Sequence, residues 1–299
     1  MPSILLAILI ASSPMLVLPS PQPEENPTPT VHSEFESPRE LLSALGEQDA
    51  LTTSLSAEIR YTVIRALEND MQMRRGDLSI KNSDNADPTQ SRKYAVRFDE
   101  LVIDNRRELI DEHFIFDGRW FVERLPEEKQ FNKRELVPKG KTLDPMELMR
   151  DAPFWVSLGR DQDRLLESYD AQLLPTTDGL IDNPDFPELK FIAELPHIVA
   201  TTQLKLTPKK GLDIEDDWEW VRIWVNPDTL LPALYIKQDW TGDLQIVELF
   251  NPKTNDDIPA SVFDTTSPDA RAGWNVHVTN WRSDKPAPSK PSDSNTDTP

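Results

Sequence analysis

Apolar and polar side chains alternate along much of this chain with the period of two that half-buried β-strands show. The alternation is clear from Leu55 to Val63, from Leu78 to Ile80 and from Tyr94 to Phe98. It returns in the second half, where we expect strands over residues 198–207, 218–225, 233–239, 244–250 and 276–281. Most of the fold is therefore predicted to be β-sheet.

A tight hairpin is predicted at Asp117-Gly118, because this dipeptide accepts positive φ in a two-residue turn. Runs rich in aromatic and branched side chains, over residues 113–116 and 119–122, flank the turn. Such runs are typical of paired strands. Neighbouring strands are therefore expected to be antiparallel.

Helical periodicity interrupts the strands in a few places. Ser37 is expected to cap a helix that has Pro38 in its first turn and Glu40 three residues after the cap. The apolar face of that helix comprises Leu41, Leu42 and Leu45. Two further helices are expected, one from Asp144 with an apolar patch at Leu148 and Met149, and one over residues 162–172. Strands with a few helices indicate an α+β fold with a curved antiparallel sheet.

The two ends of the chain differ in composition from the middle. Residues 1–18 carry no charged side chain and contain the apolar run 4–11, which suits the core of a cleaved signal peptide; an uncleaved N-terminal anchor is the alternative. Residues 19–38 hold six prolines and are expected to be a disordered linker, and residues 283–299 a disordered tail. The folded domain is expected over residues 39–282.

Net charge and cysteine content exclude several classes of protein. The chain of 299 residues has 32 basic and 52 acidic side chains, a net charge of -20, which opposes binding to a phosphate backbone. We therefore expect no nucleic-acid partner. It has no cysteine, so disulfides, thiolate metal sites, cysteine nucleophiles and lipid attachment through an N-terminal cysteine are excluded.

The spacing of glycine excludes further classes. The nine glycines are never closer together than 19 positions. A Walker A loop, a dinucleotide fingerprint and a G-x-S-x-G elbow each need two glycines within about seven residues. The four histidines are scattered, and the acidic loops at residues 178–185 and 213–217 lack the order of an EF-hand. We therefore expect no metal, no cofactor and no catalytic residue.

Several segments resemble, in order, the family of outer-membrane lipoprotein carrier proteins, the LolA-like family. These segments are Gly76 to Ile80, Arg92 to Phe98, Phe116 to Phe121, Ala152 to Leu158, Leu204 to Lys209 and Val221 to Phe263. Together the resemblance covers about residues 39 to 281. It implies an open half-barrel of antiparallel strands closed by helices that form a lid. It also implies a non-enzymatic periplasmic carrier, exported by a cleaved signal peptide, that takes up lipoprotein acyl chains.

The resemblance and the alternation together suggest site residues. The expected acyl-chain cavity is lined by Tyr94, Val96, Phe98, Val221, Ile223, Val225, Leu234 and Ile236. In the resembled family, an arginine at the position of Arg92 holds the lid through hydrogen bonds to helix backbone. Arg92 is therefore expected to contact the lid, and Leu148 and Met149 are expected to lie on the lid itself. By resemblance, the partners are an inner-membrane ABC lipoprotein-release complex and an outer-membrane receptor. The carrier is expected to be a monomer.

Three classes of function stay open from the sequence. The first is the soluble carrier of acyl chains. The second is a lipid- or lipoprotein-sensing regulatory module on the same fold, which would report to a partner protein. The third is a hydrolase with a site that no motif reveals. The identity of the cargo is not determined by the residues.

Overall fold

The alternating segments pair into one 12-stranded sheet in the computed structural model of the chain, which describes residues 35–68, 70–82, 92–104, 106–139, 162–181, 183–211 and 218–281. Strands of the first half are β1 (Ser54–Arg65), β2 (Asp70–Lys81), β3 (Lys93–Ile103), β4 (Arg106–Phe116), β5 (Trp120–Leu125) and β6 (Gln130–Glu135). Those of the second half are β7 (Tyr169–Leu174), β8 (Thr202–Pro208), β9 (Trp218–Val225), β10 (Pro232–Asp239), β11 (Leu244–Thr254) and β12 (Asn275–Thr279).

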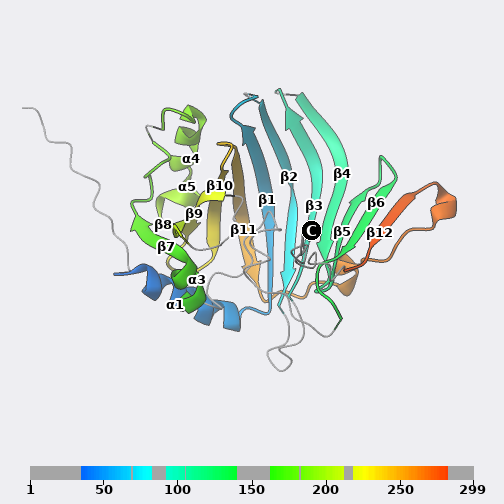
Figure 1. Cartoon of the computed structure of the whole chain (residues 1–299), viewed down its shortest axis with the longest axis horizontal. Helices are drawn as coiled ribbons and strands as arrows, with labels where there is room; N and C mark the ends of the chain where they lie inside the picture. Colours follow the sequence, from blue (N-terminus) through cyan, green and yellow to red (C-terminus); the bar gives the residue numbers. More distant parts are fainter. Residues whose placement is uncertain are drawn as a thin grey trace, which may run out of the picture. The chain divides into compact units, whose positions relative to one another are not determined.

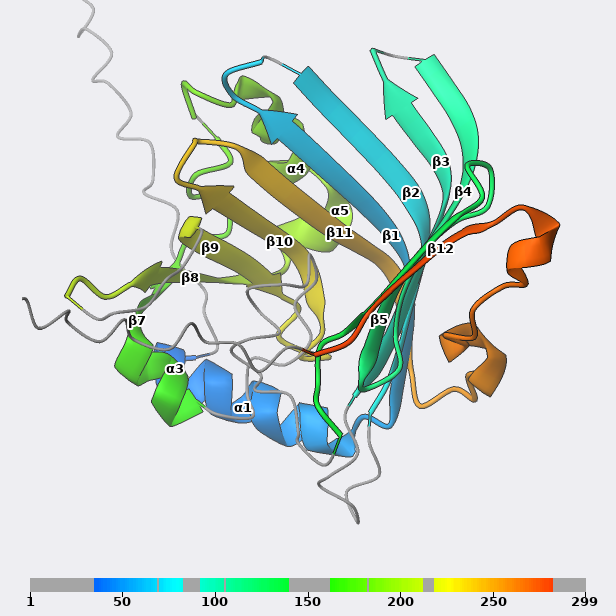
Figure 2. The same ribbon diagram turned by 45° about the vertical axis from the view of Figure 1, so that its right-hand side comes forward.

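The strand order is β12-β6-β5-β4-β3-β2-β1-β11-β10-β9-β8-β7 (Figure 1). Every neighbouring pair is antiparallel except β12 and β6, which run parallel. The sheet is open, with β12 and β7 at its two edges, and it is strongly curved (Figure 2). The expectation of a large, mostly antiparallel sheet with few helices is therefore confirmed.

Helix α1 (Pro38–Leu51) begins where the capping pattern predicts. The hydroxyl oxygen of Ser37 accepts a hydrogen bond from the backbone N–H of Glu40. The carboxylate of Glu40 in turn accepts one from the N–H of Glu36, at 2.8 Å. The first of these contacts satisfies a backbone donor that the first helical turn leaves open. Leu41, Leu42 and Leu45 are buried, as the helical periodicity predicts.

The remaining helices are short. They are α3 (Gln162–Ser168), η1 (Pro187–Leu189), α4 (Lys190–Ala193), α5 (Pro196–Val199), η2 (Ala260–Phe263) and η3 (Ala270–Ala272). Among the described helices, none is both long and apolar enough to cross a membrane.

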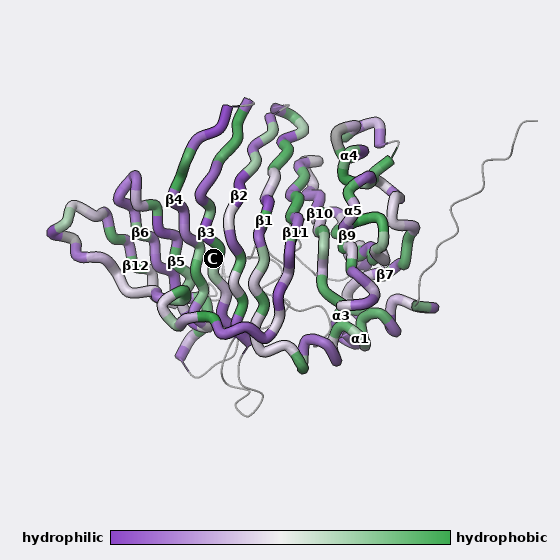
Figure 3. Tube along the Cα trace, turned by 180° about the vertical axis from the view of Figure 1, so that it is seen from behind, coloured by the Kyte–Doolittle hydropathy of each residue, from purple (hydrophilic) through white to green (hydrophobic). Residues whose placement is uncertain are grey.

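The two faces of the sheet carry separate apolar clusters, and we name the faces by them. The inner face carries the largest cluster, to which α1 contributes its three leucines and α3 contributes Leu165. The outer face carries two clusters, one beneath η1, α4 and α5 and one beneath the segment around η2. Apolar and polar positions alternate along β1 and β2 (Figure 3), which is the pattern that directs one set of side chains to each face.

Two expected element boundaries are wrong. Ile198 lies in α5 rather than in a strand, and the following strand, β8, begins at Thr202. The helix expected over residues 162–172 ends at Ser168, and Tyr169 already belongs to the edge strand β7. In both places a short apolar run was compatible with either element, and the tertiary contacts decide which one forms. Residues 1–34, 140–161 and 282–299 lie outside the described residues, so the signal peptide, most of the linker, the helix from Asp144 and the tail stay predictions.

Candidate functional site

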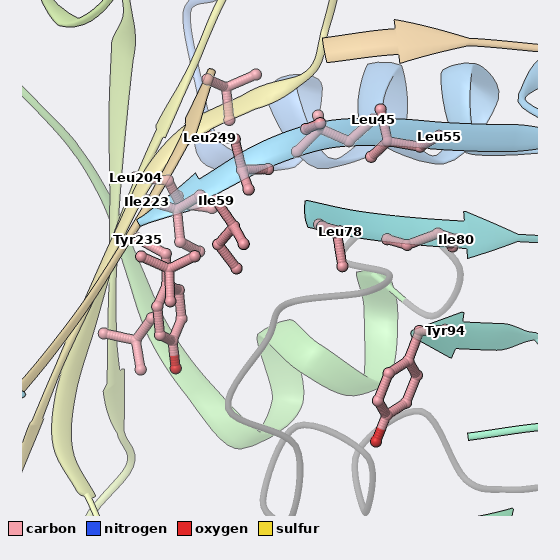
Figure 4. Packing of buried hydrophobic residues seen from close by; sticks show 14 of the residues in the cluster. Leu45, Leu55, Ile59, Leu78, Ile80, Tyr94, Leu204, Ile223, Tyr235 and Leu249 are labelled. Carbon is pink, nitrogen blue, oxygen red and sulfur yellow. The ribbon is translucent and has the colours of Figure 1, made fainter. Parts of the chain in front are cut away.

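The inner face brings together six of the eight residues expected to line a cavity. These are Tyr94, Val96 and Phe98 of β3 and Val221, Ile223 and Val225 of β9, all buried in the same cluster. The register connects β9 to β1 through the strands between them. Ile223 pairs with Tyr235, Tyr235 with Val247, and Val247 with Tyr61 of β1. Directly paired residues share a face, so an apolar row crosses four neighbouring strands; Ile59, Ile223 and Tyr235 of this region lie close together in Figure 4.

Leu234 and Ile236 do not lie on the inner face, and the prediction that they line the same surface is wrong. They pair with Trp224 and Arg222 and pack in the outer cluster beneath η1, α4 and α5. The consecutive residues 233–236 are all buried because helices cover the outer side of β10 as well. A strand buried on both sides has no polar alternation, so its sequence does not show which residues face inward. The register shows that Tyr235 is the residue of this run that faces inward.

Aromatic rings form much of the inner surface on the first strands. Tyr61 and Phe98 are stacked with ring centroids 6.1 Å apart, and Phe98 meets Phe114 edge-on at 5.9 Å. Tyr94 contacts Phe116 at 5.3 Å and Phe121 at 6.5 Å. These separations lie in the range of favourable aromatic pairs. The rings therefore give the inner face a firm apolar surface across β1, β3, β4 and β5.

Arg92 joins the sheet to the end of helix α1. Its guanidinium forms an ion pair with the carboxylate of Asp49 in α1, and its Nε donates to the side-chain oxygen of Asn82. The amide nitrogen of Asn82 donates to the backbone oxygens of Asp49 and Thr52. Asn82 thus bonds to the backbone at the end of the helix. Leu148 and Met149, the other expected lid residues, lie outside the described residues.

A small cavity lies directly beside this polar cluster. Its volume is about 90 Å³. Its apolar lining includes Leu45, Leu55, Ile80, Ile223, Val225, Leu230 and Leu231, and its polar rim includes Asp49, Asn82 and Arg92. Pockets that enclose a drug-sized ligand usually measure about 300–1,000 Å³. The cavity is therefore too small to enclose a long acyl chain as it stands.

Charged side chains interrupt the apolar inner face, and Arg74 and Glu112 are among them. Arg74 is the direct partner of Tyr61, and Glu112 is the direct partner of Phe98, so both point inward. The Nε of Arg74 lies 3.0 Å from a carboxylate oxygen of Glu112. Burial raises the pKa of Tyr61, and the nearby Arg74 charge opposes that rise. The alternation on β2 and β4 places both charges on the inner side only once the register is known, so sequence reasoning missed them.

The outer face offers a larger but more polar groove. It has a volume of about 960 Å³ and is lined in part by Glu58, Asp77, Arg97, His113 and Arg124. Burial lowers the pKa of His113, while the carboxylate of Asp111, which contacts the His113 ring, acts in the opposite direction. A surface with this many charges does not suit an acyl chain, because burial against hydrocarbon would desolvate them. Over the described residues, no cluster of three or more His, Cys, Asp or Glu side chains could hold a metal ion.

The fold and site together define an open, mostly antiparallel sheet with a largely apolar inner face, part of which two helices cover. No family model and no curated protein matches the chain. Solved structures similar to it include an uncharacterized conserved protein from Thermus thermophilus, with 11% identity and a TM-score of 0.38 over 80% of this chain and 97% of that one.

Two further solved structures are similar. One is a DUF1329 family protein from Desulfovibrio piger, with 16% identity and a TM-score of 0.35 over 76% of this chain and 95% of that one. The other is a LolA superfamily protein from Nitrosomonas europaea, with 13% identity and a TM-score of 0.32 over 74% of this chain and 96% of that one. The family that the sequence segments resemble is thus among the similar structures. Because these TM-scores are low, a functional assignment has to rest on the chain's own inner face.

Proposed function

We propose that this chain is a periplasmic carrier that binds lipoprotein acyl chains on the inner face of its sheet and moves them toward the outer membrane. One observation carries the proposal. The inner face is an apolar surface that runs across the sheet, and it continues into a small cavity beneath a helix that a polar cluster holds in place. Binding needs no covalent step, because burial of each methylene of the chain contributes about 0.8 kcal/mol to the binding free energy.

The energy of chain burial supports reversible binding. A long acyl chain offers on the order of 10 kcal/mol gross on transfer from water. Part of this energy is offset by exposing the three leucines of α1, which are buried in the inner cluster. Closely spaced glycines of an ATP-binding loop are absent from the sequence, so the energy for loading would come from a partner. By resemblance, we propose an inner-membrane ABC complex as the donor and an outer-membrane receptor as the acceptor.

The test begins with the protein purified from its own envelope fraction, analysed by native mass spectrometry. We expect a bound acylated molecule, and N-terminal sequencing of the same material should show that the segment before residue 19 has been removed. Transfer of a labelled lipopeptide to acceptor membranes is then measured. Transfer supports a carrier, whereas tight binding without transfer would favour the sensing module. If the purified protein carries no acyl chain and binds none that is added, the proposal is refuted.

A further inference from the structure

The ion pair of Arg74 and Glu112 lies on the inner face of the sheet. Arg74 and Glu112 come from β2 and β4, so the pair reaches across β3. Tyr61, Phe98 and Phe114 surround it with aromatic surface. The Arg74 and Glu112 side chains remain 23% and 20% exposed, so solvent or a ligand can reach both.

Stability alone gives little reason for such a pair. Removing two charges from water costs free energy, and an apolar pair of similar volume is often as stable or more stable. Within the described residues, the structure shows no hydrogen bond or ion pair of Arg74 other than the one from its Nε to Glu112. The terminal nitrogens of the guanidinium therefore retain donors, and one carboxylate oxygen of Glu112 retains its acceptor sites.

We propose that the Arg74–Glu112 pair binds the headgroup of a zwitterionic amphiphile, with the anionic group on Arg74 and the cationic group on Glu112. The inference rests on the acyl-chain surface of the proposed function and adds a headgroup site to it. A purely anionic headgroup would be repelled by Glu112, and a purely cationic one by Arg74. A dipolar headgroup, such as a phosphate joined to an ammonium, complements both charges while its chain lies on the aromatic surface.

The experiment compares amphiphiles that share a twelve-carbon chain, below the concentration at which each forms micelles. The ligands are dodecylphosphocholine, dodecyl phosphate, dodecyltrimethylammonium and uncharged dodecyl maltoside, measured by displacement of a hydrophobic dye from the full chain. We expect dodecylphosphocholine to bind at least about tenfold more tightly than dodecyl maltoside, in line with a charge-assisted contact. Glycerophosphocholine, which has the headgroup without the chain, should not displace the dye.

Two variants and a matched control separate the headgroup site from the fold. Arg74→Gln should reduce the zwitterionic preference about tenfold and favour dodecyltrimethylammonium. Glu112→Gln should instead shift the preference toward dodecyl phosphate. Arg75→Gln is the control, because Arg75 pairs with Glu100, at 3.7 Å, on the outer face. These opposite shifts would not arise from a purely structural ion pair.

The outcomes also distinguish this inference from the proposed function. Equal binding of all four ligands by the unaltered chain, or unchanged preferences in both folded variants, would overturn the headgroup site and leave the acyl-chain carrier intact. Displacement of the dye by glycerophosphocholine alone would show a site for soluble headgroups and would also overturn it. Failure of every amphiphile to bind would refute the proposed function itself. The comparison on the unaltered chain needs no variant to fold.

Discussion

Truncation of one isoleucine on each face of the sheet tests whether the inner face is the binding surface. Ile223 of β9 and Ile236 of β10 are 0% and 1% exposed, and they lie on adjacent antiparallel strands. Ile223 belongs to the inner cluster and lines the cavity, whereas Ile236 belongs to the outer cluster. Ile223→Ala and Ile236→Ala therefore remove the same atoms from equally buried positions, and each serves as the control for the other.

The expected losses of stability are similar. Each change removes about three carbons, or roughly 2.4 kcal/mol of transfer free energy at 0.8 kcal/mol per methylene, and leaves a cavity that adds to the cost. The total should be about 2–5 kcal/mol for each variant. The two faces differ in the surroundings of the new space, because only the space left by Ile223→Ala joins the existing cavity of about 90 Å³. A bound acyl chain can fill that space.

The assay is urea denaturation with and without a saturating twelve-carbon amphiphile. Without ligand, both variants should show a lower unfolding midpoint and an unchanged m-value. With ligand, Ile223→Ala should regain about 1 kcal/mol more than Ile236→Ala, since a ligand that binds only the folded state stabilises it. Equal recovery in both variants, or greater recovery in Ile236→Ala, would refute the assignment of the binding surface to the inner face.

Further predictions concern the helix contact, the sheet and pH. Arg92→Leu should still fold and bind a hydrophobic dye, but stopped-flow measurements should show altered release, because its ion pair to α1 is lost. Gly76→Ala should destabilise the chain by about 3 kcal/mol or more in urea denaturation, since a Cβ there would lie 1.8 Å from the backbone oxygen of Arg97. Burial lowers the pKa of His113 and of His197 in the folded chain. Their contribution to stability is therefore fully present above the unfolded pKa of about 6.5, and it is lost as the pH falls from that value through the folded pKa. Urea unfolding midpoints at pH 7.5 and pH 5.5 would measure this loss.

Controls for these predictions lie elsewhere in the same chain. Arg39→Leu breaks an exposed ion pair between α1 and α3, so it should leave dye release unchanged. Gly211→Ala introduces a Cβ with no atom within 4 Å, and its cost should come only from the φ of +85°. Release kinetics identical to the parent would remove Arg92 from the site. A stability profile unaffected by His113→Gln and His197→Gln together would contradict the assigned pKa shifts.

Local patterns predicted most of the sheet because they depend on neighbouring residues. The Ser37 cap and the strands around Tyr94 and Ile223 are set by side-chain period and capping chemistry alone. The charged stretch at residues 106–112 was not predicted as a strand, yet it forms the first part of β4. Its side chains are largely exposed or half-buried, and backbone pairing with β3 stabilises the strand without an apolar period.

The sequence alone determined the alternation that builds the sheet, the start of α1, the acidic net charge and the exclusion of nucleotide-binding and cysteine chemistry. Only the tertiary structure decided which face each side chain of β10 occupies, because that strand is apolar on both sides. It also decided that Arg74 and Glu112 meet on the inner face, since their contact joins strands 38 positions apart. Side-chain period reports whether a residue is buried, whereas strand register, which depends on pairing across the whole sheet, determines what it is buried against.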